Sequence, residues 1–219
     1  MKIRTILASL VVASCTLSGA HAAVIVSVIS TPLGGGLIAH TLNLQSDLPM
    51  RGFAIEAIAP GGMNHENAGG ALDTIFQDSN NIIPLIGGDP ALDSQFLFHT
   101  ENDFLVVAPN TQDNPENLLE DGNRIKAGFG NTNFRLFNRD VLRIVTPEPA
   151  GVVGNLAEPI FTLVNSTASQ FDENTGNETL ADISGSYDGQ NFTPIPEPAS
   201  LAMLLKKFQR RQISIFKEN

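Results

Sequence analysis

Oxygen-bearing side chains gather in one short segment of the chain, with a spacing that could hold a hard cation. Asp172, Asn174 and Glu178 fall within seven residues, and Gly176 stands between them at a position suited to a turn. Carboxylate and amide oxygens are the ligands that Ca²⁺ takes, although a full calcium loop also has a bidentate glutamate at its twelfth position. We therefore expect at most a weak calcium site here and no other cofactor.

The histidines do not have the spacing of a transition-metal site. After the first 22 residues there are three, His40, His65 and His99, and none belongs to a His-x-x-x-His pair. We expect each to be hydrogen-bonded or solvated, and zinc is not predicted. Acidic residues in other loops are interpreted as a solubilising surface; they are Asp47, Asp73 with Asp78, Asp89 with Asp93, Glu101 with Asp103, and Glu120 with Asp121.

Motifs for nucleophilic or phosphate chemistry are absent from the sequence. Residues 184–189 read Ser-Gly-Ser-Tyr-Asp-Gly, which lacks the Gly-x-Ser-x-Gly frame of a nucleophile elbow. The glycine pairs are not followed by Lys-Ser or Lys-Thr, so they do not form a phosphate loop. Carboxylates are so numerous that chance pairs at glycosidase spacing carry no information. We predict a protein that is not an enzyme.

Charge and composition narrow the choice of partners. The 219 residues have a net charge of −10, and residues 23–195 hold six basic against 21 acidic side chains, a net charge of −15. Such a surface repels nucleic acid and anionic lipid headgroups. No run of 18 apolar residues occurs, so no membrane-spanning helix is predicted. One cysteine excludes an intrachain disulfide.

The first 22 residues have the three parts of a secretory signal peptide. Residues 1–4 are basic, residues 5–19 carry no charge, and Ala20 and Ala22 form a small-x-small site. We expect this segment to be a signal helix that is cleaved between Ala22 and Ala23. An alternative uses Cys15, because residues 12–15 (Val-Ala-Ser-Cys) resemble a bacterial lipobox, in which the cysteine becomes a lipidated N-terminus.

The other end of the chain carries a more specific motif. Residues 194–205 read Pro-Ile-Pro-Glu-Pro-Ala-Ser-Leu-Ala-Met-Leu-Leu, and basic residues follow at 206–211. This segment resembles the start of a PEP-CTERM sorting tail of exported proteins from Gram-negative bacteria. The resemblance implies processing by an exosortase-type membrane protease and delivery to the cell surface or extracellular matrix. The residues that match the sorting motif are Pro196, Glu197, Pro198, Ala199 and Ser200.

This tail departs from the family pattern in length. Only seven residues separate Pro198 from Lys206, about 10 Å as a helix, whereas the hydrocarbon core is about 30 Å thick. Either a deletion or frameshift removed the spanning helix, or a short basic amphipathic helix touches a membrane surface. In both cases we expect no stable membrane span. Residues 191–219 are thus interpreted as a Pro-rich linker and a shortened tail.

Residues 23–190 are predicted to form one all-β domain. Short apolar runs alternate with Gly and Pro clusters, and Phe53, Ile55 and Ala57 share one face of a run at 51–58. One helical turn is expected at 115–120, after Pro115. The pattern favours an antiparallel two-sheet sandwich such as a jelly roll. Strands are expected at 23–29, 37–44, 51–58, 96–98, 104–107, 124–129, 134–137, 140–145, 159–164 and 181–187.

A looser resemblance covers much of this domain. Residues 75–78, 93–98 and 142–145 are similar to segments of planctomycete-type PEP-CTERM proteins. This resemblance implies a β-sandwich of uncharacterised function, of the immunoglobulin-like or cohesin-like kind. With 13 phenylalanines and no tryptophan, we expect an aromatic core built on Phe. Its expected members are Phe53, Phe76, Phe96, Phe98, Phe134 and Leu142.

Together these features predict an acidic, exported protein of a Gram-negative-type bacterium that is extracellular or at the cell surface. Its expected role is structural or adhesive, through contacts with extracellular polysaccharide or a matrix protein. Two alternatives stay open. A carbohydrate-binding module would need an exposed aromatic platform or a concave sheet face, and a secreted polysaccharide hydrolase would need two opposed carboxylates in a cleft.

Overall fold

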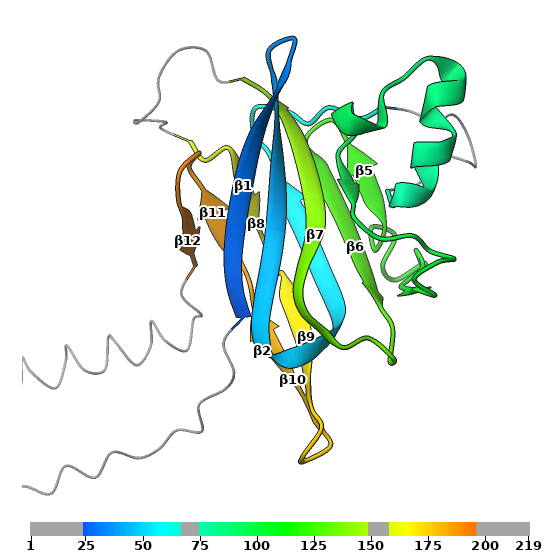
Figure 1. Cartoon of the computed structure of the whole chain (residues 1–219), viewed down its shortest axis with the longest axis vertical. Coiled ribbons are helices and arrows are strands. Elements are labelled where there is room, and N and C mark those ends of the chain that lie inside the picture. Colours follow the sequence, from blue (N-terminus) through cyan, green and yellow to red (C-terminus); the bar gives the residue numbers. More distant parts are fainter. Residues whose placement is uncertain (1–23, 67–74, 149–157, 196–219) are drawn as a thin grey trace, which may run out of the picture.

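The computed structural model of the chain describes residues 24–66, 75–148 and 158–195. The named strands within these residues pair antiparallel and lie in two layers (Figure 1), which confirms the predicted all-β sandwich class. No helix in this described part has the length and apolar character needed to cross a bilayer. The expected signal helix and C-terminal helix lie outside the described residues.

Strand and helix bounds are as follows. The strands are β1 Val24–Gly34, β2 Leu37–Ile58, β3 Gln95–Phe96, β4 Val106–Val107, β5 Leu119–Asp121, β6 Arg124–Gly130, β7 Leu136–Pro147, β8 Phe161–Leu163, β9 Thr167–Asp172, β10 Asn177–Asp182, β11 Gly185–Tyr187 and β12 Phe192–Pro194. In the described residues before β3 there are three short 3₁₀ helices, η2 Gln77–Asn81, η3 Ile83–Ile86 and η4 Pro90–Leu92.

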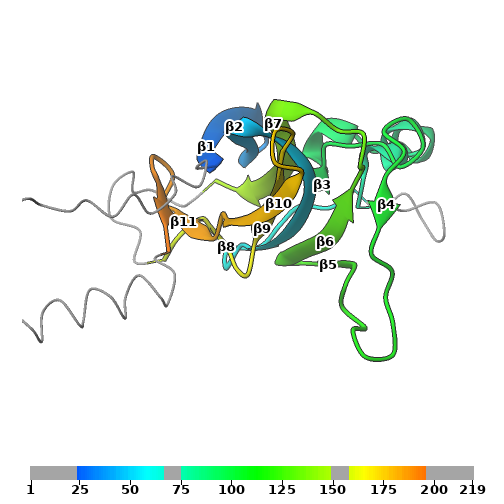
Figure 2. The same ribbon diagram turned by 90° about the horizontal axis from the view of Figure 1, so that it is seen from below.

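The long strand β2 belongs to both layers. Its first half lies between β1 and β7, and its second half lies between β6 on one side and β9 and β8 on the other. Figures 1 and 2 show β2 curling from one layer into the next. At the bend Gly52 pairs with Gly130, and a Cβ on Gly130 would lie 2.7 Å from the carbonyl oxygen of Arg51. Glycine therefore permits the close approach of β6 to the bend.

Each layer extends from β2. The front layer of Figure 1 continues from β2 through β7 to β3, and β1 flanks β2 on the other side. The rear layer continues through β6 to β4 and β5, through β9 to β10, and through β8 to β11 and β12. β12 ends at Pro194, so the sheet extends past residue 190, the expected end of the domain.

The core between the layers is aromatic, as predicted. Phe129 lies at its centre, and its ring centroid is 5.0–5.6 Å from those of Phe53, Phe76, Phe96 and Phe98. These four residues and Leu142, all expected in the core, are buried. The exception is Phe134, which is half-buried and stacks on Phe98 at the edge of the core.

Some strand predictions merge or fail for physical reasons. The runs at 37–44 and 51–58 are one strand, and those at 134–137 and 140–145 are another, which contains a bulge at Val141. The helical turn expected at 115–120 is wrong, because Leu119 and Glu120 pair with β6 as part of β5. Tertiary pairing here overrides the local preference for a helix after proline.

Candidate functional site

The backbone around the candidate site is fixed by one residue of the segment between β2 and η2. Asn64 donates its N–H to the carbonyl oxygen of Val145 in β7 at 2.7 Å. Its own carbonyl accepts from the N–H (3.0 Å) and the hydroxyl (2.8 Å) of Ser94, and its side-chain amide donates to the carbonyl of Leu92 at 2.7 Å. The residue after Asn64 and the residue before Ser94 are thereby held side by side.

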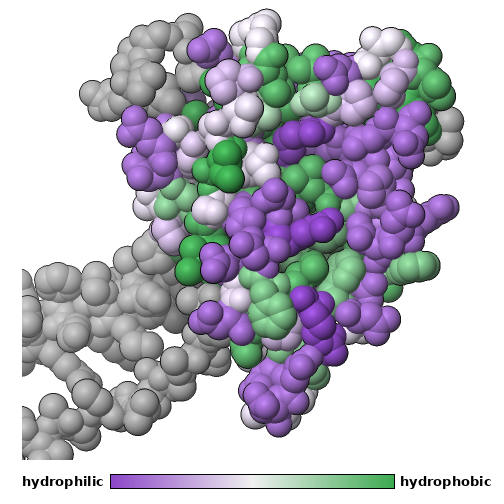
Figure 3. Space-filling view, viewed as in Figure 1, coloured by the Kyte–Doolittle hydropathy of each residue, from purple (hydrophilic) through white to green (hydrophobic). Residues whose placement is uncertain are grey.

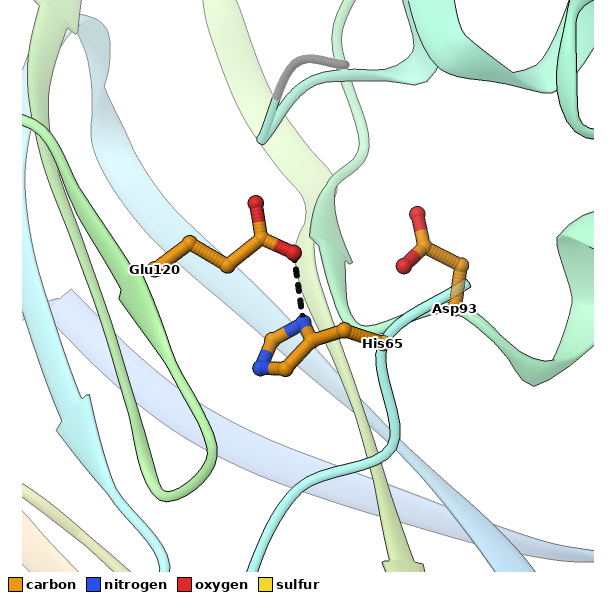
Figure 4. Close-up of side chains that lie close together, drawn as sticks. All are labelled: His65, Asp93 and Glu120. Carbon is orange, nitrogen blue, oxygen red and sulfur yellow. Dashed lines mark ion pairs between the residues drawn. The ribbon is translucent and has the colours of Figure 1, made fainter. Parts of the chain in front are cut away.

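Those two residues and one from β5 bring three ionisable side chains together. His65, Asp93 and Glu120 each offer one ligand-type atom, and these atoms all lie within 4.8 Å of one another. Figure 4 shows the three side chains pointing toward a common centre from three separate segments. Within the described part of the chain, this is the group of three His, Cys, Asp or Glu side chains that could hold a metal ion.

The hydrogen bonds of His65 define the state of its ring. Nε2 lies 2.8 Å from the backbone carbonyl oxygen of Asp121, and because a carbonyl can only accept, Nε2 carries the hydrogen. The other nitrogen, Nδ1, lies 2.7 Å from Oε1 of Glu120. At this distance a protonated ring forms an ion pair with the carboxylate of Glu120, and this contact raises the pKa of His65. A neutral ring would place two lone pairs against each other at this distance, so the position favours either a proton on Nδ1 or a metal ion between the two atoms.

The electrostatics of the site also favour positive charge. Asp93 is 3% exposed, and burial raises the pKa of its carboxyl to about 7, against the N–H of Glu66, which donates to it at 3.1 Å. Burial alone would lower the pKa of His65, but the contact with Glu120 and the charge of Asp93 outweigh it, so that this pKa is raised. The two carboxylates are thus poorly solvated and incompletely balanced.

A half-buried arginine contacts the backbone of Asp93. Arg143 in β7 donates from Nε to the carbonyl oxygen of Asp93 at 3.0 Å and from a terminal nitrogen to that of Pro90. Burial lowers the pKa of Arg143, although Asp93 and Asp89 oppose the effect. The guanidinium is committed to backbone carbonyls, so it orients the loop before β3 and leaves the centre of the cluster to His65 and the carboxylates.

The residues expected to hold calcium are not brought together by the hairpin of β9 and β10. Asp172 accepts the backbone N–H of Asn174 at 2.9 Å, and such bonds lower the pKa of its carboxyl. Glu178 pairs with Phe171, the residue before Asp172, so that its side chain points to the opposite face. There it accepts a hydrogen bond from Ser169. The side chains of Asp172 and Glu178 therefore do not point toward a common centre at which calcium could bind.

The other two histidines behave differently from His65. His40 is buried and hydrogen-bonded to hydroxyls, as expected, and burial lowers its pKa to about 4. His99 lies with its Nδ1 4.0 Å from Oδ1 of Asp78, a loose contact near the surface. The expectation of a merely hydrogen-bonded or solvated histidine is therefore incomplete for His65, which faces two carboxylates.

A second feature is a polar hollow on the face of β2 and β7. Its volume is about 420 Å³. Asn43 spans it, donating its side-chain amide to Asn138 and to Asp140, each at 2.8 Å. Figure 3 shows hydrophilic residues gathered over the middle of this side of the molecule. The described lining consists of Asn43, Gln77, Leu97, Asn138, Arg139 and Asp140, none of which is aromatic.

The sequence did not single out Asp93 and Glu120 as partners of His65, because they belong to segments far apart in the chain. The predicted cleavage residues, Cys15 and the motif at 196–200 lie outside the described residues. Comparison with protein-family models, curated proteins and solved structures finds no match for the chain.

Proposed function

We propose that this chain is an exported, non-enzymatic protein of the cell surface or extracellular matrix, with a structural or adhesive role. The observation that carries the proposal is the pair of motifs that flank the β domain, a signal-peptide-like start ending at Ala22 and the Pro-Glu-Pro segment beginning at Pro196. The resemblance of that segment to a sorting tail adds an exosortase-type protease as a partner.

The domain between the motifs suits this role. Its loops are tied to the sheets by hydrogen bonds such as those of Asn64, and its strands enclose one aromatic core. A net charge of −15 over residues 23–195 keeps copies of the domain apart and soluble outside the cell. A stable, acidic β domain of this kind can present a surface to extracellular polysaccharide or to a matrix protein.

Fractionation of the native host tests the proposal. We expect the chain in the envelope or the medium, with a new N-terminus at Ala23 measured by mass spectrometry. A variant in which Ala20 and Ala22 are replaced by bulky residues should accumulate with residues 1–22 attached, and Glu197→Gln should alter release from the envelope. An intact wild-type chain in the cytosol would overturn the proposal of export.

Carbohydrate binding is the second candidate, and the polar hollow favours it. Amide, carboxylate and guanidinium groups of Asn138, Asp140 and Arg139 line the hollow and match the hydroxyl groups of a sugar. A pull-down with polymeric glycans should then retain the wild-type chain and lose Asn138→Ala. Retention that is the same for both proteins would place any glycan contact elsewhere. Release of soluble sugar from the glycan would contradict the non-enzymatic role.

A further inference from the structure

We propose that His65, Asp93 and Glu120 bind one divalent transition-metal ion, and that Zn²⁺ is its occupant. The inference goes beyond the structural or adhesive role, and it stands whether or not the chain is exported. It depends on side chains from three separate segments whose ligand-type atoms all lie within 4.8 Å of one another.

The imidazole is already oriented as a metal ligand. In protein metal sites a ligating histidine donates its second ring N–H to a carbonyl or carboxylate, which fixes the tautomer and the direction of the ring. His65 does this through Nε2 and the carbonyl oxygen of Asp121, 2.8 Å away. Nδ1 is buried and lies 2.7 Å from Oε1 of Glu120, in an ion-pair contact that a metal ion would replace. Metal binding would release the proton of Nδ1, and the ring would then direct its lone pair to the centre of the cluster.

The carboxylates supply the charge that a metal ion would neutralise. Asp93 is 3% exposed, and the side chain of Glu120 is 22% exposed, so both have lost much of their hydration. Burying carboxylates without a compensating charge is unfavourable. The guanidinium of the nearby Arg143 donates its described hydrogen bonds to the carbonyl oxygens of Asp93 and Pro90 and not to a carboxylate. A divalent ion at the centre would balance the two negative charges.

The geometry needs shifts of no more than about 1.4 Å, because ligand-type atoms up to 4.8 Å apart must come to about 3.4 Å. Ligands that lie 2.0–2.2 Å from a tetrahedral Zn²⁺ are about 3.4 Å from one another. The 2.7 Å between Nδ1 of His65 and Oε1 of Glu120 must therefore open by less than about 1 Å. The partly exposed Glu120 can swing by that amount, and water can fill a fourth position.

The donor set selects the class of metal ion. One imidazole nitrogen and two carboxylate oxygens suit Zn²⁺ and its first-row neighbours, whereas Ca²⁺ takes six to eight oxygen ligands. Three donors with a nitrogen among them cannot meet that requirement. We therefore expect Zn²⁺ to bind and Ca²⁺ to fail at this site.

Metal binding here would join parts of the fold that the sheet leaves separate. His65 lies in the segment after β2, Asp93 in the loop before β3, and Glu120 in β5. β3 pairs with β7 in the front layer, whereas β5 pairs with β6 in the rear layer. The ion would thus cross-link the two layers at this end of the sandwich.

The test is calorimetric titration of the full chain, without an affinity tag, with Zn²⁺ and separately with Ca²⁺. We expect one Zn²⁺ per chain. Glu120→Gln keeps the shape of the side chain but removes its charge, and it should weaken Zn²⁺ binding by at least about 10–100-fold. Asp93→Asn should do the same, and circular dichroism will verify that each variant is folded. The matched control is Asp78→Asn, which alters the loose contact with His99 and should leave binding unchanged.

Two results would overturn the inference. Absence of saturable Zn²⁺ binding to the folded wild-type chain would show that the cluster is a histidine–glutamate ion pair beside a buried aspartate. Binding that survives in folded Glu120→Gln and Asp93→Asn would show that Zn²⁺ uses other side chains. Thermal melting gives an independent readout, because Zn²⁺ should raise the midpoint of the wild type and of Asp78→Asn but not that of Glu120→Gln.

Discussion

The buried histidine of the front layer should make the stability of the fold depend on pH. His40 is 1% exposed, with Nδ1 2.8 Å from Oγ of Ser30 and Nε2 3.1 Å from Oγ1 of Thr146. Phe161 and Tyr187 cover the ring. Hydroxyls suit a neutral imidazole, but none of these contacts offsets the desolvation of a charged one. Burial accordingly lowers the pKa of His40 to about 4 from its ordinary 6.5.

The sign and size of the effect follow from linkage. The folded state holds His40 neutral, and the unfolded state takes up a proton near pH 6.5, so this contribution is complete above pH 6.5 and is lost as the pH falls toward 4. With pKa values of about 4 and 6.5, the loss is about 1.4 kcal/mol at pH 5.5 and about 3 kcal/mol at pH 4.

Urea unfolding followed by circular dichroism at pH 8 and pH 5.5 measures the effect. The variant His40→Gln keeps a hydrogen-bonding side chain that does not titrate, so the difference between wild type and variant isolates this group. That isolation is needed because Asp93, with a pKa raised to about 7, titrates in an overlapping range with the opposite sign. At an m-value of about 2 kcal/mol/M, the wild-type midpoint should fall about 0.7 M more than that of the variant. Equal pH dependence in the two proteins would refute the reasoning.

Three further predictions concern packing, charge and backbone approach, each measured as the free energy of unfolding in urea. Phe129→Ala removes the central ring of the core and should lower the free energy of unfolding by about 3–5 kcal/mol. Phe137 is half-exposed, so Phe137→Ala should lower it by less than about 1 kcal/mol, and equal losses would contradict the central role of Phe129. Glu56→Gln breaks ion pairs with two cations at a largely buried position and should lower the free energy of unfolding by about 1–2 kcal/mol. Glu173 is exposed, so Glu173→Gln should lower it by less than about 0.5 kcal/mol. Equal losses would mean that burial does not strengthen the ion pairs of Glu56. Gly130→Ala places a Cβ 2.7 Å from a backbone oxygen and should cost about 1–3 kcal/mol, unless the strands separate freely at the bend of β2.

The strands that could be predicted are those whose side chains alternate. Phe53, Ile55 and Ala57 are all buried, so the period of two identified the second half of β2 and its inner face. Alternation says nothing about polar strands that are held by specific partners. β9 was missed for this reason: its Gln170 is buried, yet its side chain is satisfied by a hydrogen bond of 2.6 Å to Oγ of Ser46.

The candidate metal centre was not predictable from spacing, and the reason is topological. His65, Asp93 and Glu120 are separated by 27 residues or more along the chain, so no short sequence motif contains two of them. In the sequence, Asp93 and Glu120 could be recognised only as members of acidic loops. They meet His65 because Asn64 is hydrogen-bonded to both β7 and the loop before β3, and because Asp121 receives the hydrogen of the imidazole.

His40 and His65 illustrate why residue type alone could not assign a role. Adjacent residues of β7 help to position both side chains. The hydroxyl of Thr146 contacts the ring of His40, and the carbonyl oxygen of Val145 accepts the N–H of Asn64, the residue before His65. The ring of His40 is buried beside hydroxyls and has no carboxylate partner, so desolvation disfavours a positive charge and lowers its pKa. The other meets two carboxylates, so a positive charge is favoured and the pKa rises. A proton would therefore weaken the fold at His40, whereas a cation would strengthen it at His65, although one strand positions both.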